Sequence, residues 1–389
     1  MLNIVAILFL ISVGLILFTY GLYPIILWLL SQFKSKKYFT SDSNLPTVSI
    51  IISAYNEEDV IEKTIRNFLQ SEYDMQKIEI IIGSDLSTDK TNQIVAELQK
   101  EFSNIIFLPF DQRRGKANVL NDLVRVAKNE VLVFSDANTI YEKNAIRELV
   151  KYYSDKRIGG VCGKLILLDV EKAKLDGSQE KEYWEYESWI KNNEGKLGIL
   201  IGANGGIYSI RRELYVDIPS AFPVMDDFYV GLKVLEKNRD FIYASEAKAT
   251  EFVAPSVEWE FKRKVRTISI NLDSVRYVKS LLNPKYGLIS FAFWSHKIIR
   301  WATPLLMIIA FLLNLFLLDS FLFKTVFLLQ SSFYISALIG FFLAKFKISI
   351  KIFGFCYYFL VTNIALLGGI YKFLSNKQTA AWQSTERVQ

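Results

Sequence analysis

Long apolar runs lie near both ends of the chain and enclose a block of mixed polarity. The first run covers residues 3–30, and three more cover residues 299–318, 321–344 and 353–374. Each has about the length that an α-helix needs to cross the roughly 30 Å hydrocarbon core of a bilayer. The pattern therefore predicts one membrane-spanning helix before the mixed block of residues 45–286 and three after it.

The first apolar run differs from a cleaved signal peptide, because no basic residue precedes it and no small-x-small cleavage pattern follows it. Lysines follow this run and also lie between the last two runs: Lys34, Lys36, Lys37, Lys345, Lys347 and Lys351. The positive-inside rule places both groups in the cytoplasm. We expect a multi-pass protein of the cell membrane with its large block in the cytoplasm, although Lys372, Lys377 and Arg387 oppose this orientation.

Within the block, short apolar runs of strand length alternate with amphipathic runs of helix length. The expected strands are residues 47–54, 78–83, 105–108 and 131–134, and the expected helices are residues 57–70, 88–102 and 115–126. This alternation predicts βαβ units and a mainly parallel sheet. After residue 159 we expect short strands, an aromatic and acidic helix at 181–193, and a basic helix at 258–282 that lies on the membrane surface.

Composition narrows the class of protein. The chain has 389 residues, of which 51% are hydrophobic and 22% charged, and its net charge is +6. The two cysteines, Cys162 and Cys356, fall in the block and in a predicted span, which excludes a cysteine-based zinc site. His296 is the only histidine; we expect an interfacial residue without chemistry, and no Ser-His-Asp hydrolase. No basic stripe typical of nucleic-acid binding is present.

Polar oxygen ligands follow three of the predicted strands where each strand ends. Glu57 follows the first strand, Asp85 follows the second, and Asp136 with Asn138 follows the strand at 131–134. Ligands of open α/β sheets bind beyond the carboxyl ends of the strands. Oxygen side chains there suit a hard divalent cation that bridges to substrate phosphates. Asp and Asn after a strand, taken alone, are better explained as a cap of the next helix, but three acidic strand ends in register favour a nucleotide site.

Four motifs together resemble the inverting glycosyltransferase family 2, within its membrane-embedded branch of cellulose, hyaluronan and poly-N-acetylglucosamine synthases. They are PTVSIIISAYNEE, SDLSTDKT, RRGKANVLN and VFSDANT. The resemblance covers residues 46–266 and implies an α/β fold of the GT-A type, which is Rossmann-like with a mainly parallel mixed sheet. The expected divisions are a membrane helix at 1–31, the GT-A domain at 45–255, amphipathic interface helices at 256–298, three membrane helices at 299–374 and a tail at 375–389.

The resemblance implies a nucleotide-sugar site. Tyr55 and Glu57 would line the base pocket, and Asp85 would accept a hydrogen bond from a uracil ring. Lys116 would neutralise the diphosphate; a lysine in the first turn of a helix is poorly placed by the helix dipole alone, which favours a bound anion.

A cation site and a catalytic pair follow from the same resemblance. Asp136 and Asn138 match the Asp-x-Asp element that holds ribose and Mg²⁺ or Mn²⁺, with Asn in place of the second Asp. Asp227 would be the base that takes the proton of the acceptor hydroxyl, and Asp226 would support it or raise its pKa. Without the resemblance, two carboxylates at a helix start explain this pair equally well. Arg266 would stabilise the leaving diphosphate.

The acceptor side is less specific. Asn204 and Gly205, in a glycine-rich turn, would border the acceptor pocket, because glycine lets backbone approach a ligand closely. Trp184 would stack on a sugar ring. An ordinary hairpin turn and a helix that packs on the core are the alternatives.

One motif departs from the processive branch, which carries Gln-x-x-Arg-Trp in the basic helix. Here the aligned residues are Arg263 to Thr267, so the Gln and Trp are absent. We therefore expect a membrane-bound inverting glycosyltransferase that moves a sugar from a UDP-sugar to a lipid-linked or growing saccharide. A processive polysaccharide synthase is the alternative within the class, and a non-catalytic scaffold of a polysaccharide export complex is the alternative outside it.

Overall fold

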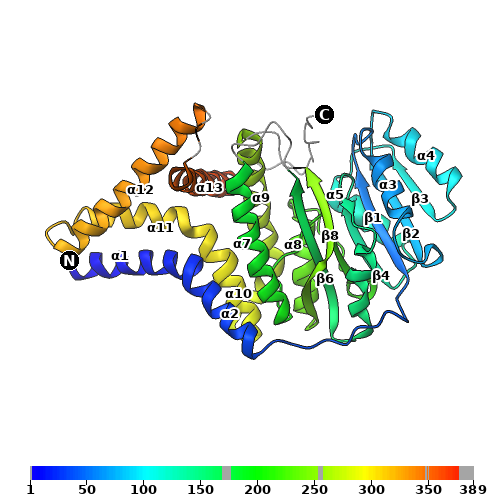
Figure 1. The fold of residues 1–389 in the computed structure, drawn as a ribbon, viewed down its shortest axis with the longest axis horizontal. Coiled ribbons are helices and arrows are strands. Elements are labelled where there is room, and N and C mark those ends of the chain that lie inside the picture. The colour runs from blue at the N-terminus through cyan, green and yellow to red at the C-terminus, as the bar shows by residue number, and fades with distance from the viewer. Residues whose placement is uncertain (1, 169–176, 253–256, 347, 349, 376–389) are drawn as a thin grey trace.

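The computed structural model describes residues 2–168, 177–252, 257–346, 348 and 350–375. The predicted tail of residues 375–389 lies outside these ranges from residue 376 onward. Figure 1 shows the α/β domain on one side, the membrane-type helices on the other, and the long helices α7 (Gly177–Lys196) and α9 (Val257–Val278) between them. The predicted class, an α/β domain with long apolar helices, is confirmed.

The first half of the sheet is parallel, as the alternation predicts. Strand β1 (Val48–Ala54) lies between β2 (Ile78–Asp85) and β4 (Val131–Asp136), and β3 (Ile105–Phe110) pairs with β2 at the edge. The central strands are buried on both faces, which explains their continuous isoleucine and valine runs. The register pairs Ser53 with Asp136 and Ala54 with Ser84, so the acidic strand ends lie along one edge.

The second half makes the sheet mixed. Among the described residues the strand order is β3-β2-β1-β4-β7-β6-β8-β5. Strand β7 (Tyr208–Arg211) is antiparallel to both β4 and β6 (Ile158–Leu168), and β8 (Asp240–Phe252) runs parallel to β6. The two-residue strand β5 (Ile140–Tyr141) pairs antiparallel with β8. Strands β6 and β8 are longer than the short strands expected after residue 159.

Helices cover both faces of the sheet. Ile50 and Ile52 face the core on the side of α3 (Ile61–Leu69) and α4 (Thr91–Glu101), whereas Ile51 faces the opposite core. That second core contains residues of α5 (Lys116–Val126), α7 and α8 (Asp226–Glu236). The short helix α6 (Ala145–Val150) completes the first core. The alternation of side chains along a strand therefore divides one isoleucine run between two cores.

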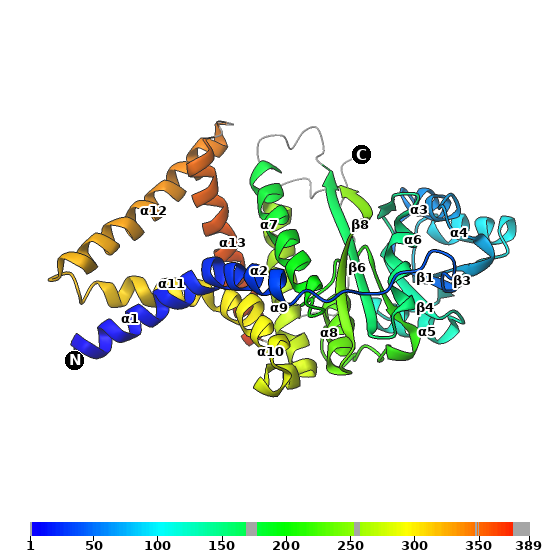
Figure 2. The same cartoon turned by 60° about the horizontal axis from the view of Figure 1, so that its bottom comes forward.

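Four helical segments of the described chain are long and apolar enough to cross a membrane: Ile4–Phe33, Leu288–Asn314, Phe321–Lys345 and Lys351–Leu374. The first consists of α1 (Leu2–Leu17), a π-helical turn and α2 (Tyr23–Phe33). The second joins α10 (Leu288–Ala292) to α11 (Ile299–Asn314), and the last two are α12 and α13. Helices α1 and α11 lie side by side in both views (Figure 2).

The second of these segments begins before residue 299, where the apolar run starts. Its polar residues do not interrupt the helix because they are buried in an ionic cluster with α7. His296 is wholly buried, with Nδ1 2.7 Å from Glu194 Oε1 and Nε2 3.1 Å from Glu187 Oε2. Tyr23 donates to Glu194 at 2.8 Å, and Arg300 pairs with Glu187. The expected interfacial place of His296 is therefore wrong: buried carboxylates require partners, and His296 is one of them.

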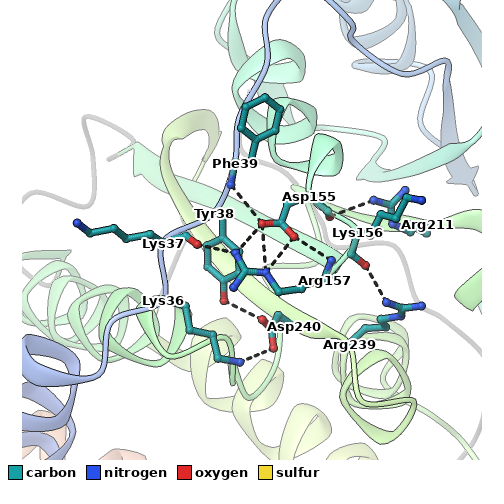
Figure 3. A network of polar contacts seen from close by, with 10 residues as sticks. All are labelled: Lys36, Lys37, Tyr38, Phe39, Asp155, Lys156, Arg157, Arg211, Arg239 and Asp240. Carbon is teal, nitrogen blue, oxygen red and sulfur yellow. Dashed lines mark hydrogen bonds and ion pairs between the residues drawn. The ribbon is translucent and has the colours of Figure 1, made fainter.

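The segment after α2 is bonded to Asp155, which lies shortly before β6, and to Asp240, which begins β8 (Figure 3). Lys36 Nζ lies 2.6 Å from Asp240 Oδ1, and the Tyr38 hydroxyl donates to Asp240 Oδ2 at 3.1 Å. The Phe39 amide donates to Asp155 Oδ2 at 3.2 Å. Together these contacts hold the segment that connects the N-terminal helix to the α/β domain.

Candidate active site

The loop Asn204–Gly205–Gly206 brings two of the predicted acidic residues together. A Cβ atom added to Gly205 would lie 3.4 Å from Asp227 Oδ2 and 3.5 Å from Asp136 Oδ2. Asp136 comes from the carboxyl end of β4, whereas Asp227 comes from the first turn of α8, 91 positions later in the chain. The two carboxylates therefore flank one glycine, where the backbone takes up the least space.

Lys116 lies between Asp136, the predicted cation ligand, and Asp226 of the predicted catalytic pair. Its Nζ lies 2.9 Å from Asp136 Oδ1 and 3.2 Å from Asp226 Oδ2. Lys116 opens α5 directly after Gly115, whose φ of +78° sets the turn out of β3. Burial lowers the pKa of the lysine, but the carboxylates of Asp136 and Asp226 outweigh burial and raise it above its ordinary value. The ammonium charge is therefore permanent at physiological pH.

Asp227 has the protonation behaviour of a general base. Burial and the neighbouring charge of Asp226 raise its pKa from 3.8 to about 7, while Lys116 and Lys191 act in the opposite direction. The Phe228 amide donates to Asp227 Oδ1 at 2.7 Å, which holds the carboxylate at the start of α8. When the pKa of a carboxylate lies near the operating pH, much of it is ionised and able to act as a base. Its affinity for a proton is then also high enough to favour proton transfer.

The nucleotide side of the site lies at the ends of β1 and β2. Asp85 accepts hydrogen bonds from the backbone amides of Arg114 at 2.6 Å and Gly115 at 3.1 Å. Arg113 Nε lies 3.2 Å from Asp85 Oδ2, and its guanidinium carbon lies 3.5 Å from the centre of the Tyr55 ring. The loop that carries Lys116 is thus folded onto the two residues predicted to meet the base. Arg113 was not assigned a role, although it belongs to the RRGKANVLN motif.

Glu57 also lies at this edge. Its side chain is buried, and its backbone amide donates to Thr91 Oγ1 at 2.8 Å. Asn56 precedes it with a φ of +53°, and the Asn56 Oδ1 atom accepts a hydrogen bond from the Thr88 amide at 2.9 Å. These bonds tie the end of β1 to the loop after β2, which places Glu57 beside the predicted base pocket.

The donor set at the end of β4 fits a hard divalent cation. Asp136 contributes carboxylate oxygens, and Asn138 follows two positions later with an amide oxygen. Within the described ranges no three His, Cys, Asp or Glu side chains form a closed metal cage. A cation held here would therefore complete its shell with water and with phosphate oxygens, as Mg²⁺ commonly does.

Glu251, on β8, belongs to this cluster although no motif pointed to it. The Thr139 hydroxyl donates to Glu251 Oε1. Burial and the charge of Asp136 raise the pKa of Glu251 to about 7, and Thr139, Arg263 and Lys116 act in the opposite direction. Only the pairing of β8 with the chain after β4 places this residue near Asp136, so no local pattern could reveal it.

Arg266 lies on α9 within electrostatic reach of the same carboxylate. Burial lowers its pKa, Arg263 lowers it further, and Asp136 raises it. Helix α9, which the sequence predicted to lie on the membrane surface, therefore holds the guanidinium charge of Arg266 where it interacts with Asp136.

The three residues predicted for the acceptor side, Asn204, Gly205 and Trp184, differ in their surroundings. Gly205 faces both catalytic-side carboxylates. Asn204 is buried and donates to the Gly163 carbonyl at 2.8 Å, and its Oδ1 accepts from Lys191. The Trp184 indole donates to the Leu165 carbonyl at 2.9 Å, and its ring centre lies 5.7 Å from Lys191 Nζ. Lys191, which the sequence did not single out, connects Trp184 to the loop.

The sheet thus gathers acidic strand ends, a lysine between two carboxylates and a carboxylate pair at the start of a helix. Residues 49–218 match the family Glycosyl transferase family 2.

Curated relatives support this assignment. Poly-β-1,6-N-acetyl-D-glucosamine synthase of Staphylococcus aureus is 26% identical over 235 residues, which cover 60% of this chain and 56% of the relative. A probable glycosyltransferase of Bacillus subtilis, YdaM, is 31% identical over 174 residues, covering 44% of this chain and 41% of the relative. The chain thus spans about half the length of the curated relatives that it matches.

The whole architecture also has a solved counterpart. A mannosyltransferase from Pyrobaculum calidifontis, in complex with GDP-mannose and Mn²⁺, aligns with a TM-score of 0.72 over 95% of this chain and 100% of its own. Sequence identity is 18%, so this likeness establishes the fold.

Proposed function

We propose that the protein is a membrane-bound inverting glycosyltransferase that moves a sugar from a nucleotide-sugar, a UDP-sugar, to a lipid-linked or growing saccharide. The transfer would serve the synthesis of a polysaccharide or related glycan. The observation that carries the proposal is the position of Asp227 and Asp136 on two sides of Gly205. In this arrangement a base for the acceptor would lie close to a ligand of the cation that binds the donor diphosphate.

In the proposed reaction, Asp227 takes the proton of the acceptor hydroxyl as its oxygen attacks the anomeric carbon. The bond from that carbon to the diphosphate oxygen breaks, and the nucleoside diphosphate leaves with the electron pair. Lys116 and Arg266 would neutralise the leaving charge. Asp136 and Asn138 would hold Mg²⁺ or Mn²⁺, which supplies further charge stabilisation to the diphosphate. Asp226 would keep Asp227 basic by like-charge repulsion.

The relatives support the choice of substrates. The S. aureus relatives are named for a poly-N-acetylglucosamine product, and the P. calidifontis structure contains GDP-mannose with Mn²⁺. In this chain Tyr55 and Asp85 would read the base, and the contacts of Arg113 with the Tyr55 ring and with Asp85 support this by bringing the two residues together. The assay must therefore compare uridine and guanosine donors directly.

A lipid-linked acceptor is supported by the helices beside the site. A groove of about 390 Å³ lies between α9 and α13, lined by Glu258, Phe261, Tyr357, Val361 and Ile364. The same α9 helix carries Arg266 toward Asp136. We propose that this groove takes the isoprenoid or acyl chain of the acceptor, with the α/β domain on the cytoplasmic side of the cell membrane.

The deciding experiment incubates the full chain, purified in lipid nanodiscs, with UDP- or GDP-sugars and Mn²⁺ or Mg²⁺. Nucleotide release and product mass are measured, with Asp136→Ala and Asp227→Asn as inactive variants and Glu246→Gln, an exposed change on β8, as control. One added sugar per acceptor supports our proposal, and a ladder of products supports a processive synthase. Release from no donor, with wild type equal to Asp136→Ala, would favour the non-catalytic scaffold and reject the enzyme.

A further inference from the structure

The cation site has a charge deficit. The second position of its Asp-x-Asp element is Asn138, so only Asp136 contributes a negative charge from this motif. Asp136 is also paired with the Lys116 ammonium at 2.9 Å, which offsets part of that charge. A hard divalent cation binds carboxylate oxygens more strongly than neutral oxygens. Another carboxylate near Asp136 would therefore strengthen binding of the cation.

The sheet supplies one from a distant part of the chain. Strand β5 pairs antiparallel with β8, with Ile140 opposite Thr250 and Tyr141 opposite Ala249. Continuing this register by one residue places Glu251 opposite Thr139, the residue directly after Asn138. The Thr139 hydroxyl bonds to Glu251 Oε1, and the Thr139 amide donates to the Asp136 carbonyl at 3.3 Å.

The glycine-rich loop covers both carboxylates. A Cβ added to Gly206 would lie 2.4 Å from Glu251 Oε1, and a Cβ added to the adjacent Gly205 would lie 3.5 Å from Asp136 Oδ2. The two adjacent glycines thus lie beside two different carboxylates, Gly205 beside Asp136 and Gly206 beside Glu251. Asp136 and Glu251 therefore lie beside adjacent positions of the same loop.

We propose that Glu251 supplies the second negative charge of the cation site, in place of the Asp that Asn138 replaces. Glu251 is a positioning residue: it acts through the cation that Asp136 would hold against the donor diphosphate. The inference rests on the proposed function, since it requires that a divalent cation binds at Asp136.

The test measures binding of Mn²⁺ alone, and of Mn²⁺ with UDP or GDP, to the full chain by electron paramagnetic resonance of the free ion. We expect Glu251→Gln, which keeps the size and a hydrogen-bond acceptor, to weaken Mn²⁺ binding on the order of tenfold or more. Adding Asn138→Asp to Glu251→Gln returns the lost charge and recovers most of that affinity. Glu246→Gln, on the exposed face of the same strand, serves as matched control and binds as wild type.

Each outcome separates the inference from the proposed function. If Asp136→Asn loses Mn²⁺ while Glu251→Gln keeps wild-type affinity, the role of Glu251 is rejected and the glycosyltransferase site stands. If Glu251→Gln weakens binding but Asn138→Asp does not restore it, the charge-replacement argument is rejected. If the wild type releases nucleotide from a donor but binds no Mn²⁺, the cation site itself is rejected. Melting temperatures in EDTA confirm that the variants are folded.

Discussion

Lys116 Nζ lies 2.9 Å from Asp136 Oδ1, and the same ammonium lies 3.2 Å from Asp226 Oδ2. One cation therefore connects the donor side of the site with the carboxylate that neighbours the base. A bound diphosphate can take up this charge only by competing with the two carboxylates. Asp136 would be freed from Lys116 if it held a divalent cation, because the cation would supply the positive charge that Lys116 gives it here.

Removing the Lys116 charge should weaken nucleotide binding. We expect Lys116→Met to lower the affinity for UDP or GDP with Mn²⁺, and kcat/KM to fall about 10²–10³-fold, as for loss of one preorganised donor to a developing anion. Lys116→Arg keeps the charge and should retain part of both. Isothermal titration calorimetry with the nucleoside diphosphate gives the affinity, and an unchanged affinity in Lys116→Met would contradict the assigned role.

The catalytic rate should follow the ionisation of Asp227. Its pKa of about 7 means that the base form grows as pH rises, so kcat should increase through neutral pH and level off above it. Asp226→Asn removes the like charge that raises the pKa, so the inflection should move to lower pH. A pH–rate profile of both proteins checks this, and an inflection that stays in place in Asp226→Asn argues against coupling of the pair.

Asp227→Asn should separate activity from stability. We expect a loss of transfer of about 10²–10⁴-fold, typical for removal of a general base, with nucleotide binding retained. Because the folded-state pKa lies above the usual 3.8, wild-type folding stability falls as pH rises from about 4 to 7. Asp227→Asn lacks this loss, so its melting temperature relative to wild type should be higher at pH 8 than at pH 4. The reverse order would show that Asp227 is not disfavoured as an anion.

Two adjacent glycines should respond differently to alanine. A Cβ at Gly205 makes ordinary contacts of 3.4 and 3.5 Å with Asp227 and Asp136, so Gly205→Ala should fold normally while its methyl group occupies space between the two carboxylates. We expect a marked fall in kcat/KM with an unchanged melting temperature. A Cβ at Gly206 would lie 2.4 Å from Glu251 Oε1, so Gly206→Ala should displace Glu251 and also weaken Mn²⁺ binding. Equal Mn²⁺ affinities in the two variants would contradict this contrast.

The ionic cluster between α7 and the membrane-type helices should contribute to stability through the pairing of its charges. Arg300→Met leaves the buried Glu187 without its strongest partner, and such losses destabilise proteins by about 3–5 kcal/mol. Adding Glu187→Gln should recover much of the loss. Arg125→Met, which breaks an exposed pair with Asp217, should change stability little, because water and salt screen an exposed ion pair. Unfolding by denaturant in detergent gives the free energy of unfolding of the wild type and of these variants. No recovery in the double variant would reject charge pairing as the cause.

Local chemistry made much of this protein predictable from sequence. The runs of apolar residues determine the membrane-type helices, since length and composition alone decide whether a helix suits a bilayer. The continuous apolar runs, rich in isoleucine in β1 and β2 and in valine in β4, determine these strands, because only buried central strands are apolar on both faces. Parallel pairing then places Asp85 and Asp136 on one edge, which is why the motifs predicted their part of the site.

The remaining features depend on contacts between residues far apart in the chain. Glu251 reaches the site only through the pairing of β8 with β5, and Lys191 only through the packing of α7 against the glycine-rich loop. His296 is read from sequence as an interfacial residue, but the carboxylates of α7 that bury it lie 102 and 109 positions away. Sequence patterns report the preference of a residue for water, lipid or a strand, because that preference is local. The charge that a side chain finally meets is decided by tertiary packing.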